Sequence, residues 1–468
     1  MPSVYIETFG CQMNEADSRY IAERAVAAGY TVASAPEEAD VVVLNTCTVR
    51  DSAERRAYGR MNHLKALKSS EREVRLIVTG CLAEQDRDRM RERAPHLDAV
   101  FGTRELVQLG DQLAAWQPAL RHARDDAARD DAVDGATDNM LHFALGGTPD
   151  GLPSAFSHLR AFVTVQRGCS YYCTFCIVPQ VRGRFDHRPQ AAIVDEVRGR
   201  VALGAREIML VGQTVNAWRD PADGSDFGDL CRAISRLAGL ERLTFISPHP
   251  KDFREKILDD LAAVPQLNPR IHLPLQSGSD AMLRRMNRKY TMGQFQRVVE
   301  SIRSRLPECA ITTDLIVGFP GETEDDFEAT LQCVESGVFA NAFTFIYSIR
   351  RGTPAARWEQ VPRETALARF RRLVDAQNRV TRAYHQTKVG RVVRALIAGD
   401  SKKDARRLTA KTPDNVTIVA PKPPDYSDAP MGEARAYSRT PWLDIAIESA
   451  HVWGCAGSVV ARVERFSM

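Results

Sequence analysis

The first hundred residues alternate between short apolar runs and longer stretches with helical periodicity. The run Val41-Val42-Val43-Leu44 is continuous, as expected of a parallel strand that is buried on both faces. Strands are predicted at 4–9, 41–44 and 76–78, and helices at 14–28, 51–68 and 83–93. Strands that alternate with helices imply an α/β fold, so residues 1–120 are predicted to form a doubly wound parallel sheet domain.

The same rhythm resumes at 154–386 and extends over six strand–helix units. Strands are predicted at 162–166, 207–211, 242–246, 270–273, 312–317 and 342–347. Helices are predicted between them at 191–203, 229–238, 250–263, 280–286, 292–305 and 323–335. Six successive units predict a (β/α)6 partial TIM barrel, with its chemistry at the carboxyl ends of the strands.

Two further regions complete the domain plan. Between 121 and 138, six aspartates stand among alanines and three arginines, which is too polar for a core, so 121–153 is predicted to be an exposed acidic linker. Residues 387–468 contain short β-rich runs at 391–397, 416–419, 443–449 and 458–464, separated by prolines and glycines. They predict a small antiparallel β-barrel.

Composition fits a soluble globular protein of two to four domains, with 468 residues of which 44% are hydrophobic and 26% charged. No run of 18 apolar residues predicts a membrane span, and the N-terminus enters a strand-like run rather than a signal peptide. Ten cysteines without a secretory signal indicate a reducing compartment, where thiols more often bind metals or react than form disulfides. A cytoplasmic protein without membrane contact is therefore expected.

Three cysteines, Cys169, Cys173 and Cys176, follow the first predicted barrel strand at C-x3-C-x2-C spacing. Iron–sulfur clusters are held mainly by thiolates, and three thiolates leave one iron of a four-iron cluster without a protein ligand. Such an iron can bind and reduce a small molecule. The alternative is a zinc loop, but zinc usually takes four ligands as two spaced pairs, and no fourth ligand is close in sequence.

Three other cysteines, Cys11, Cys47 and Cys81, each follow one of the first three predicted strands. Their separations are 36 (47 − 11) and 34 (81 − 47), about one strand–helix unit each. Because the carboxyl ends of parallel strands share one edge of the sheet, we expect these thiols to meet there and to form a second cluster site with one open iron. The alternative is three unrelated buried cysteines.

These motifs resemble those of a known enzyme family. The C-x3-C-x2-C loop with Phe175 before its last cysteine resembles the signature of radical S-adenosylmethionine (SAM) enzymes. The segments 8–15, 45–50 and 79–81 resemble the N-terminal domain of the methylthiotransferases. The resemblance implies two [4Fe-4S] clusters and SAM as cofactors. One cluster would cleave SAM to a radical, and the other, auxiliary cluster would handle the sulfur that is transferred.

Loops after the barrel strands carry glycines, amides and hydroxyls that suit a nucleoside ligand. Alone, each loop is a turn, but 272–279 and 314–323 resemble the SAM and substrate pocket of this family. The cofactor-binding candidates are Gln213, Asn216, Ser247, Gln276, Ser277, Gly318, Pro320, Gly321 and Glu322. His249 and His272 are either chemical groups or satisfied structural histidines.

The C-terminal region resembles a TRAM domain, an RNA-binding barrel of OB type. Residues 350–411 contain 17 Lys+Arg and 5 Asp+Glu, a local balance of +12, which suits a phosphate backbone. The RNA-binding candidates are Lys402, Lys403, Arg406 and Arg407. The alternative is a solvated helix face, since 364–385 is helical in pattern.

Within the family, the motifs at 8–15 and 401–404 are most similar to the MiaB-type tRNA methylthiotransferases. The resemblance implies methylthiolation at C2 of N6-isopentenyladenosine at position 37 of tRNA, next to the anticodon. The partners it implies are tRNA, an electron donor such as a flavodoxin-type reductant, and a sulfur donor, with the protein acting as a monomer. Two alternatives stay open: a methylthiotransferase for threonylcarbamoyl-adenosine or a ribosomal-protein aspartate, and a non-catalytic iron–sulfur RNA-binding protein.

Overall fold

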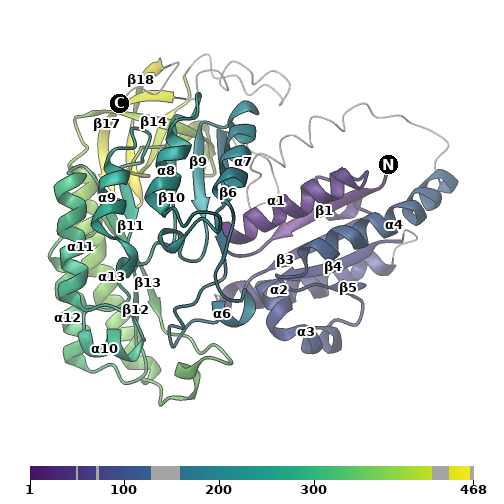
Figure 1. The fold of residues 1–468 in the computed structure, drawn as a ribbon, viewed down its shortest axis with the longest axis horizontal. Helices are drawn as coiled ribbons and strands as arrows, with labels where there is room; N and C mark the ends of the chain where they lie inside the picture. The colour runs from purple at the N-terminus through teal and green to yellow at the C-terminus, as the bar shows by residue number, and fades with distance from the viewer. Residues whose placement is uncertain (49–50, 70–72, 128–158, 424–441, 464–468) are drawn as a thin grey trace. The chain divides into compact units, whose positions relative to one another are not determined.

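The structure is a computed structural model that describes residues 1–48, 51–69, 73–127, 159–423 and 442–463 (Figure 1). Its internal contacts divide the chain into two compact units. The first unit comprises Met1–Thr164 and Val178–Arg184, and the second comprises Val165–Ile177 and Phe185–Met468. The predicted N-terminal domain lies within the first unit, whereas the C-terminal region shares the second unit with most of the predicted barrel.

A five-stranded parallel sheet forms the centre of the first unit (Figure 1). Its strand order is β2-β1-β3-β4-β5, so β1, β3 and β4 are neighbours. The strands are β1 (Ser3–Thr8), β2 (Thr31–Val32), β3 (Val41–Thr46), β4 (Arg75–Gly80) and β5 (Ala99–Val100). The helices are α1 (Gln12–Ala27), α2 (Asp51–Leu64), α3 (Cys81–Arg93) and α4 (Leu106–Ala127), with 3-10 turns η1 (Pro36–Glu38) and η2 (Lys65–Ser69). The doubly wound parallel sheet predicted from the sequence is confirmed.

Both faces of this sheet are covered, because successive residues of a strand point to opposite sides. Val41 and Val43 of β3 pack with residues of α1 and α4, whereas Val42 and Leu44 pack with residues of α2 and α3. All four are buried. This two-sided burial is the physical reason why the strand reads as a continuous apolar run.

Helix α4 was not predicted, and it changes the expected linker. Leu106, Leu109 and Leu113 recur at helical spacing and pack into the core on the α1 side of the sheet. The helix continues to Ala127, so the first seven residues of the predicted linker (121–127) are helical. Alanine and arginine, frequent in 121–127, are among the best helix formers, which is consistent with this extension. Residues 128–153 of the predicted linker lie outside the described residues.

All six strands predicted for the partial barrel are present. They are β6 (Arg160–Thr164), β9 (Glu207–Val211), β10 (Arg242–Phe245), β11 (Arg270–His272), β12 (Ala310–Val317) and β13 (Asn341–Ile346). β9 pairs with β10, and β12 pairs with both β11 and β13, always in parallel. Between β10 and β11 the described part of the chain forms no continuous ladder, only the isolated bridge Leu243–Leu267, so the strands divide into two parallel sheets at that point.

Helices alternate with these strands as predicted (Figure 1). They are α7 (Gln190–Ala202), α8 (Phe227–Ser235), α9 (Glu255–Ala262), α10 (Asp280–Arg285), α11 (Met292–Arg305) and α12 (Glu324–Glu335). Short elements lie beside them: β7 (Gln166–Arg167), β8 (Asp186–His187), α6 (Val178–Val181), η4 (Val215–Ala217), η5 (Pro250–Asp252) and η6 (Pro354–Arg357). Side-chain capping boxes fix where several of these helices begin, for example Thr291 with Gln294 at α11.

A long helix, α13 (Arg363–Gln386), leads into a closed five-stranded barrel. Its strands are β14 (Val392–Ser401), β15 (Asp404–Lys411), β16 (Thr417–Pro421), β17 (Trp442–His451) and β18 (Gly454–Val463). Strand β15 was not predicted, because alternation is weak in its polar first half. The prediction of a purely antiparallel barrel is wrong at one pair: β16 and β18 run parallel, which closes the barrel.

Buried Arg242 of β10 explains why this barrel and the central strands form one unit. Its guanidinium donates a hydrogen bond to the Thr412 carbonyl (3.1 Å) and lies over the ring of Trp442 (5.3 Å to the centroid). Glu207 of the neighbouring strand balances its charge at 3.7 Å, and both side chains are 1% exposed. In the described part of the chain, no helix combines the length and apolar character needed to cross a membrane.

Candidate functional site

Cys11, Cys47 and Cys81 lie at the carboxyl ends of three adjacent parallel strands. Cys11 is the N-cap of α1, Cys47 follows β3, and Cys81 is the first residue of α3, directly after β4. The register pairs Thr8 with Asn45 and Thr46 with Gly80, so the three strand ends are level. The structure therefore brings the three predicted cysteines to one edge of the sheet, where open α/β sheets bind ligands.

Two glycines allow this close approach. Gly10 and Gly80 each precede a cysteine and have φ values of +129° and +100°, which non-glycine residues rarely adopt. A Cβ on Gly10 would lie 2.6 Å from the Cβ of Cys47, and a Cβ on Gly80 would lie 2.2 Å from the carbonyl oxygen of Thr46. The absence of a side chain at these two positions lets the cysteine-bearing loops pack against one another.

Asn14 and Asn45 join the loops through buried side-chain hydrogen bonds. The Asn14 amide donates to the Asn45 side-chain oxygen (3.1 Å) and to the Thr46 carbonyl (2.9 Å), while the Asn45 amide donates to the Asn14 carbonyl (2.8 Å). The Cys11 thiol lies 3.6 Å from the Asn14 side-chain oxygen. Both asparagines are fully buried. These polar residues of the two predicted motifs thus hold the strand ends together.

A buried arginine that the sequence did not single out completes this site. Arg182, two residues before the end of the segment Val178–Arg184, donates from Nε to Cys81 Sγ (3.2 Å) and from Nη2 to the Asn14 side-chain oxygen (3.2 Å). Its Nη2 also lies 2.9 Å from the Asp17 carboxylate. Burial alone would lower the pKa of Arg182, but the charges of Cys81, Asp17 and Cys11 outweigh it and raise that pKa.

The same surroundings shift the pKa of the Cys81 thiol. Burial raises the pKa of Cys81, and the positive charge of Arg182 acts in the opposite direction. A guanidinium directed at sulfur suits a negatively charged, metal-bound thiolate better than a neutral thiol, which is a weak acceptor. The donor set at this edge therefore fits an iron–sulfur cluster.

The second set, Cys169, Cys173 and Cys176, lies on one loop of the second unit that follows β7. Gly168 and Tyr172 have positive φ values (72° and 51°), and the Cys176 amide donates to the Cys173 carbonyl (3.0 Å), which makes the loop turn tightly. The end of α10 supports it, since the Thr174 amide donates to the Met286 carbonyl (3.1 Å). The loop geometry is therefore set by its neighbours as well as by its own sequence.

Arg288 is the counterpart of Arg182 at this second site. It is buried and donates from Nη1 to Cys173 Sγ (3.4 Å), from Nε to the Tyr290 hydroxyl (3.1 Å) and from Nη2 to the Pro274 carbonyl (3.0 Å). The Thr214 hydroxyl lies 3.5 Å from Cys169 Sγ. Burial raises the pKa of Cys169, and the Thr214 hydroxyl opposes this. Neither Arg288 nor Thr214 was singled out from the sequence, because no spacing links them to the cysteines.

Sulfur spacing bears on the zinc alternative. Across the described ranges, no three cysteine sulfurs lie within 4.8 Å of one another. Thiolates around one tetrahedral zinc ion, each ~2.3 Å from the metal, would be ~3.8 Å apart. In each triad at least one pair of sulfurs is therefore farther apart than in such a zinc site.

Several of the predicted cofactor-binding residues support their loops. The Asn216 side-chain oxygen accepts a hydrogen bond from the His249 backbone amide (2.8 Å), and its side-chain nitrogen donates one to the His249 carbonyl (2.9 Å). Ser277 is fully buried, and its hydroxyl lies 3.3 Å from that of Thr330. Glu322 accepts a hydrogen bond from the Gly318 amide (2.8 Å) and pairs with Arg369 (2.9 Å).

The remaining candidates have other surroundings. The Pro320 carbonyl accepts a hydrogen bond from Arg285 (2.6 Å), and Gly321 has a φ of +81° beside the same arginine. Ser247 and Gln276 have positive φ values of 56° and 77°, an uncommon conformation that concentrates at functional sites. The side-chain oxygen of Gln213 is buried without a hydrogen-bond partner in the protein, as expected of a group that awaits a ligand.

His249 is a packing residue in this structure. Its ring lies 4.5 Å from that of Tyr171 and 5.5 Å from that of Tyr290, centroid to centroid. Burial, with the charges of Arg288 and Lys251, lowers the pKa of His249 to about 2, so the ring is neutral at ordinary pH. His272 differs, with its Nε2 3.2 Å from the Asp314 carboxylate. The Nε2 atom of His249 is nevertheless buried without a hydrogen-bond partner in the protein, so the ring is neutral and packed but not fully satisfied.

The RNA-binding candidates gather at one hairpin of the C-terminal barrel. Lys402 and Lys403 occupy the exposed turn between β14 and β15, and Arg406 and Arg407 lie on β15. The Arg406 side chain is 91% exposed and pairs with Asp404 at 3.3 Å. Lys402, Lys403 and Arg406 are exposed on this short segment, whereas Arg407 is partly buried.

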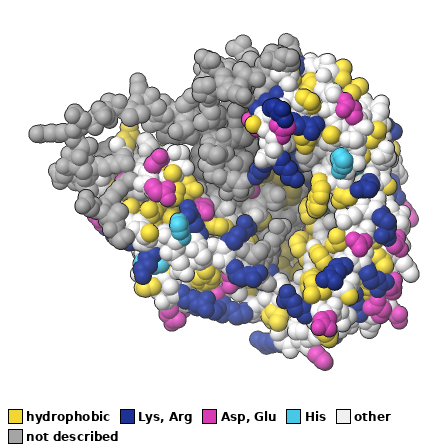
Figure 2. All heavy atoms as spheres, turned by 180° about the vertical axis from the view of Figure 1, so that it is seen from behind, with side chains coloured by type: hydrophobic (Ala, Val, Ile, Leu, Met, Phe, Trp, Pro, Cys, Tyr) yellow, Lys and Arg dark blue, Asp and Glu magenta, His cyan; other side chains and the backbone are white. Residues whose placement is uncertain are grey.

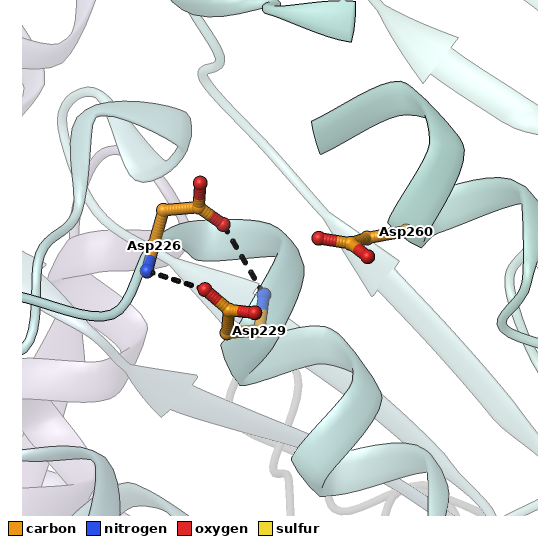
Figure 3. Close-up of side chains that lie close together, drawn as sticks. All are labelled: Asp226, Asp229 and Asp260. Carbon is orange, nitrogen blue, oxygen red and sulfur yellow. Dashed lines mark hydrogen bonds between the residues drawn. The ribbon is translucent and has the colours of Figure 1, made fainter. Parts of the chain in front are cut away.

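Asp226, Asp229 and Asp260 form an acidic cluster in the second unit (Figure 3). Asp226 and Asp229 form the capping box of α8, drawn by the dashed lines in Figure 3. The Lys256 ammonium lies 3.1, 3.0 and 2.8 Å from the three carboxylates in that order. The lysine supplies the positive charge that a metal ion would otherwise bring, so this cluster is a structural ion-pair network.

Two family models match this chain, one over the N-terminal sheet and the other over most of the barrel strands. The model of the Uncharacterized protein family UPF0004 matches residues 3–102, and that of the Radical SAM superfamily matches residues 163–334. These ranges contain the first and the second set of cysteines, respectively.

Solved structures with a similar fold include the radical SAM methyltransferase TsrM from Kitasatospora setae, solved with cobalamin and a [4Fe-4S] cluster. The TM-score is 0.54 at 16% identity, covering 76% of this chain and 77% of that one. The cobalamin-dependent SAM radical enzyme OxsB gives a TM-score of 0.51 at 12% identity, covering 80% and 56%. At such identities the likeness shows the fold alone, and it confirms the predicted fold class.

Sequence relatives are much closer. A tRNA-2-methylthio-N(6)-dimethylallyladenosine synthase of Acidothermus cellulolyticus is 44% identical over 426 residues, covering 88% of this chain and 82% of that protein. The corresponding synthase of Syntrophotalea carbinolica is 40% identical over 427 residues, covering 91% and 95%. With such identity over most of both chains, this protein belongs to the tRNA-2-methylthio-N(6)-dimethylallyladenosine synthase family of radical SAM methylthiotransferases.

Proposed function

We propose that this protein methylthiolates C2 of N6-isopentenyladenosine at position 37 of tRNA, with SAM and two [4Fe-4S] clusters as cofactors. The observation that carries the proposal is the pairing of 40–44% identity to synthases of this name with two separate cysteine triads in the chain. C2 of adenine carries an unreactive C–H bond that acid–base groups do not break readily. A cofactor must therefore supply the radical, while the protein supplies position and shielding.

We assign one cluster to Cys11, Cys47 and Cys81 and the other to Cys169, Cys173 and Cys176. When bound, the barrel cluster supplies the electron that cleaves SAM, and the auxiliary cluster supplies the sulfur. The chain contributes charge and geometry to both sites: Arg182 directs a hydrogen bond to Cys81, and Arg288 directs one to Cys173.

We assign SAM and the adenine to the loops at the carboxyl ends of the barrel strands. Gln213, Ser247 and Gln276 are the best candidates for direct contact, because one has an unpartnered buried oxygen and two have uncommon backbone conformations. Asn216, Ser277 and Glu322 instead hold the loops in place through their hydrogen bonds. Gly318, Pro320 and Gly321 shape the loop after β12, where Gly318 has a φ of +67°.

The C-terminal barrel is proposed to bind the tRNA backbone. Its support is the exposed hairpin with Lys402, Lys403, Arg406 and Arg407, within a region that has a charge balance of +12. Figure 2 shows lysine and arginine side chains (dark blue) in several groups over one face of the molecule. A base in a structured anticodon loop must be splayed out to reach an enzyme site, which backbone contacts on either side would favour.

Replacing Lys402, Lys403, Arg406 and Arg407 with alanine tests the RNA surface. Each lost phosphate contact lowers the slope of log affinity against log salt by ~0.7, so four contacts predict a slope that is lower by up to about 3. Arg379→Ala, which removes an exposed arginine paired with Glu335 on α13, is the control. An unchanged slope in the fourfold variant would place the RNA site elsewhere.

Anaerobic turnover tests the proposed reaction. Reconstituted protein, SAM, sulfide and a strong reductant should convert isopentenylated tRNA to its 2-methylthio form, detected by nucleoside mass spectrometry. The same tRNA without the isopentenyl group is the control substrate. Modification of threonylcarbamoyl-adenosine tRNA or of a ribosomal-protein aspartate in its place would support the alternative methylthiotransferases. Cluster binding with no turnover on any of them would support a non-catalytic iron–sulfur RNA-binding protein.

We propose that the protein works in the cytoplasm as a monomer, with a flavodoxin-type electron donor and a separate sulfur donor. We also retain the division into an N-terminal domain (1–120), a linker (121–153), a radical SAM core (154–386) and a TRAM domain (387–468). Limited proteolysis of the RNA-free protein would test this division, with cleavage expected first within the linker.

A further inference from the structure

Arg182 is a cation of the first unit that lies within hydrogen-bonding distance of a cysteine sulfur. Its side chain is 4% exposed, and that of its partner Asp17 is 2% exposed. A guanidinium stays charged at all accessible pH values, so a full positive charge is buried 3.2 Å from Cys81 Sγ. A buried charge is costly unless it is paired and hydrogen-bonded, and Arg182 is both.

The segment that carries Arg182 is held firmly. Thr103 donates to the Val181 carbonyl, Arg104 donates to the Gln180 carbonyl (3.0 Å), and the Arg182 amide donates to the Val178 carbonyl (2.8 Å). In sequence, this segment begins two residues after Cys176, yet its contacts belong to the first unit. Arg182 is therefore delivered to the N-terminal cysteines by a fixed piece of backbone rather than by a mobile side chain at the surface.

Hydrogen bonds to the sulfurs and nearby charge are two of the factors that set the reduction potential of an iron–sulfur cluster. One-electron reduction adds a negative charge to the cluster, and a buried cation stabilises the reduced form more than the oxidised form. Asp17 acts in the opposite sense, because its carboxylate offsets part of the Arg182 charge at 2.9 Å. The two residues therefore form a charge pair of which only the arginine bonds to sulfur.

We propose that Arg182 is a positioning residue that raises the reduction potential of the cluster held by Cys11, Cys47 and Cys81, and that Asp17 moderates this effect. The inference rests on the proposed function, since it requires a cluster at these cysteines. Lysine cannot replace the arginine fully, because a single ammonium does not offer the planar fork that reaches Cys81 and Asn14 together.

The test uses the full-length protein with Cys169, Cys173 and Cys176 replaced by alanine, so that only the N-terminal cluster is present. In this background, Arg182→Met, Arg182→Lys and Asp17→Asn are compared by EPR-monitored redox titration and by iron content. Arg182→Met should lower the potential enough to reduce the ratio of reduced to oxidised cluster about tenfold at the parental midpoint, which is about 59 mV for one electron. Arg182→Lys should give a smaller shift in the same direction, and Asp17→Asn a shift to higher potential.

Arg60→Met is the matched control, because Arg60 also pairs with a carboxylate in the first unit, Glu7 at 2.8 Å, but bonds to no sulfur. It should leave the potential unchanged. Equal potentials for the parent, Arg182→Met and Asp17→Asn would overturn the inference, and so would loss of the cluster in all three test variants, which would make Arg182 only a structural residue. If Arg182→Met is the only variant that fails to load iron, the Asp17→Asn variant tests the inference instead. A shift to higher potential supports the inference, and a shift to lower potential overturns it. A parental background without any cluster would instead contradict the proposed function.

Discussion

Cys11, Cys47 and Cys81 come from three separate strand ends of the first unit, whereas Cys169, Cys173 and Cys176 lie within one eight-residue loop (169 to 176) of the second. The first set exists only when β1, β3 and β4 pair in register, while the members of the second are already neighbours in the sequence. Both nevertheless receive a hydrogen bond from a buried arginine, Arg182 or Arg288, that is distant in sequence from the sulfur it contacts. The two sites thus differ in architecture, but in each a buried arginine places a positive charge beside a cysteine sulfur.

This comparison predicts that the two sites fail in different ways, and the largest effect should come from removing the cysteines. Replacing Cys169, Cys173 and Cys176 with alanine should abolish formation of 5′-deoxyadenosine, because no cluster remains to reduce SAM. Replacing Cys11, Cys47 and Cys81 should abolish the methylthiolated product while slow SAM cleavage continues.

Both products should be measured in parallel, after iron analysis has shown that each triple variant retains about four irons, one four-iron cluster. The proposed division of labour is wrong if the N-terminal variant still forms the methylthio product, or if the loop variant still forms 5′-deoxyadenosine.

The non-local site should also be the more sensitive to backbone packing. Gly80→Ala places a Cβ 2.2 Å from the Thr46 carbonyl oxygen at a φ of +100°, so it should destabilise the first unit by ~1–3 kcal/mol or more and reduce iron at that site. Gly59→Ala on α2 is the control: no atom lies within 4 Å of its new Cβ, and it should stabilise the helix by ~1 kcal/mol. Iron content and thermal unfolding would check both, and equal stability of the two variants would contradict the packing argument.

Acid should act on the second site through His249. Its pKa is about 2 in the folded protein against an ordinary 6.5, so below pH 6.5 the unfolded state binds more protons and stability falls. At pH 5 the loss is ~2 kcal/mol, from 1.5 pH units at ~1.36 kcal/mol each. The contribution is fully retained above pH 6.5.

Calorimetry of the unfolding transition of the second unit at pH 5 and pH 7.5 would measure this loss. His249→Phe keeps the aromatic contact with Tyr171 but cannot titrate, so its pH dependence should be weaker. If the variant and the parent respond equally, another group is responsible.

The smallest expected effect is at Thr214, the hydroxyl 3.5 Å from Cys169 Sγ. Thr214→Val preserves shape but removes this contact and the hydrogen bond to the Gln213 carbonyl (2.7 Å), with an expected cost of ~1 kcal/mol. The barrel cluster should still assemble, and 5′-deoxyadenosine formation should slow by less than about tenfold. Loss of that cluster in Thr214→Val would mean that the loop is less autonomous than its local sequence suggests.

Much of the fold was readable because apolar periodicity is a local property. The continuous run Val41–Leu44 predicted a strand buried on both faces, and the structure packs α1 and α4 on one side and α2 and α3 on the other. Elements with weak patterns were missed, such as the two-residue β2 and the polar strand β15, and helix α4 was not predicted either. The parallel β16–β18 pair was missed as well, because strand direction in a closed barrel depends on chain tracing rather than on composition.

The candidate site also combines features that local sequence patterns predict with features that depend on long-range contacts. Both cysteine triads could be predicted from the sequence, one from loop spacing and the other from the regular placement of a cysteine after each of three strands. Which other side chains reach the sulfurs depends on the tertiary structure. A single arginine carries no periodicity or spacing signal, and the partners of Arg182 and Arg288 are set by packing between segments 101 and 115 residues apart. Local patterns encode elements and local ligand sets, whereas the charges that tune those ligands depend on long-range contacts that exist only in the folded chain.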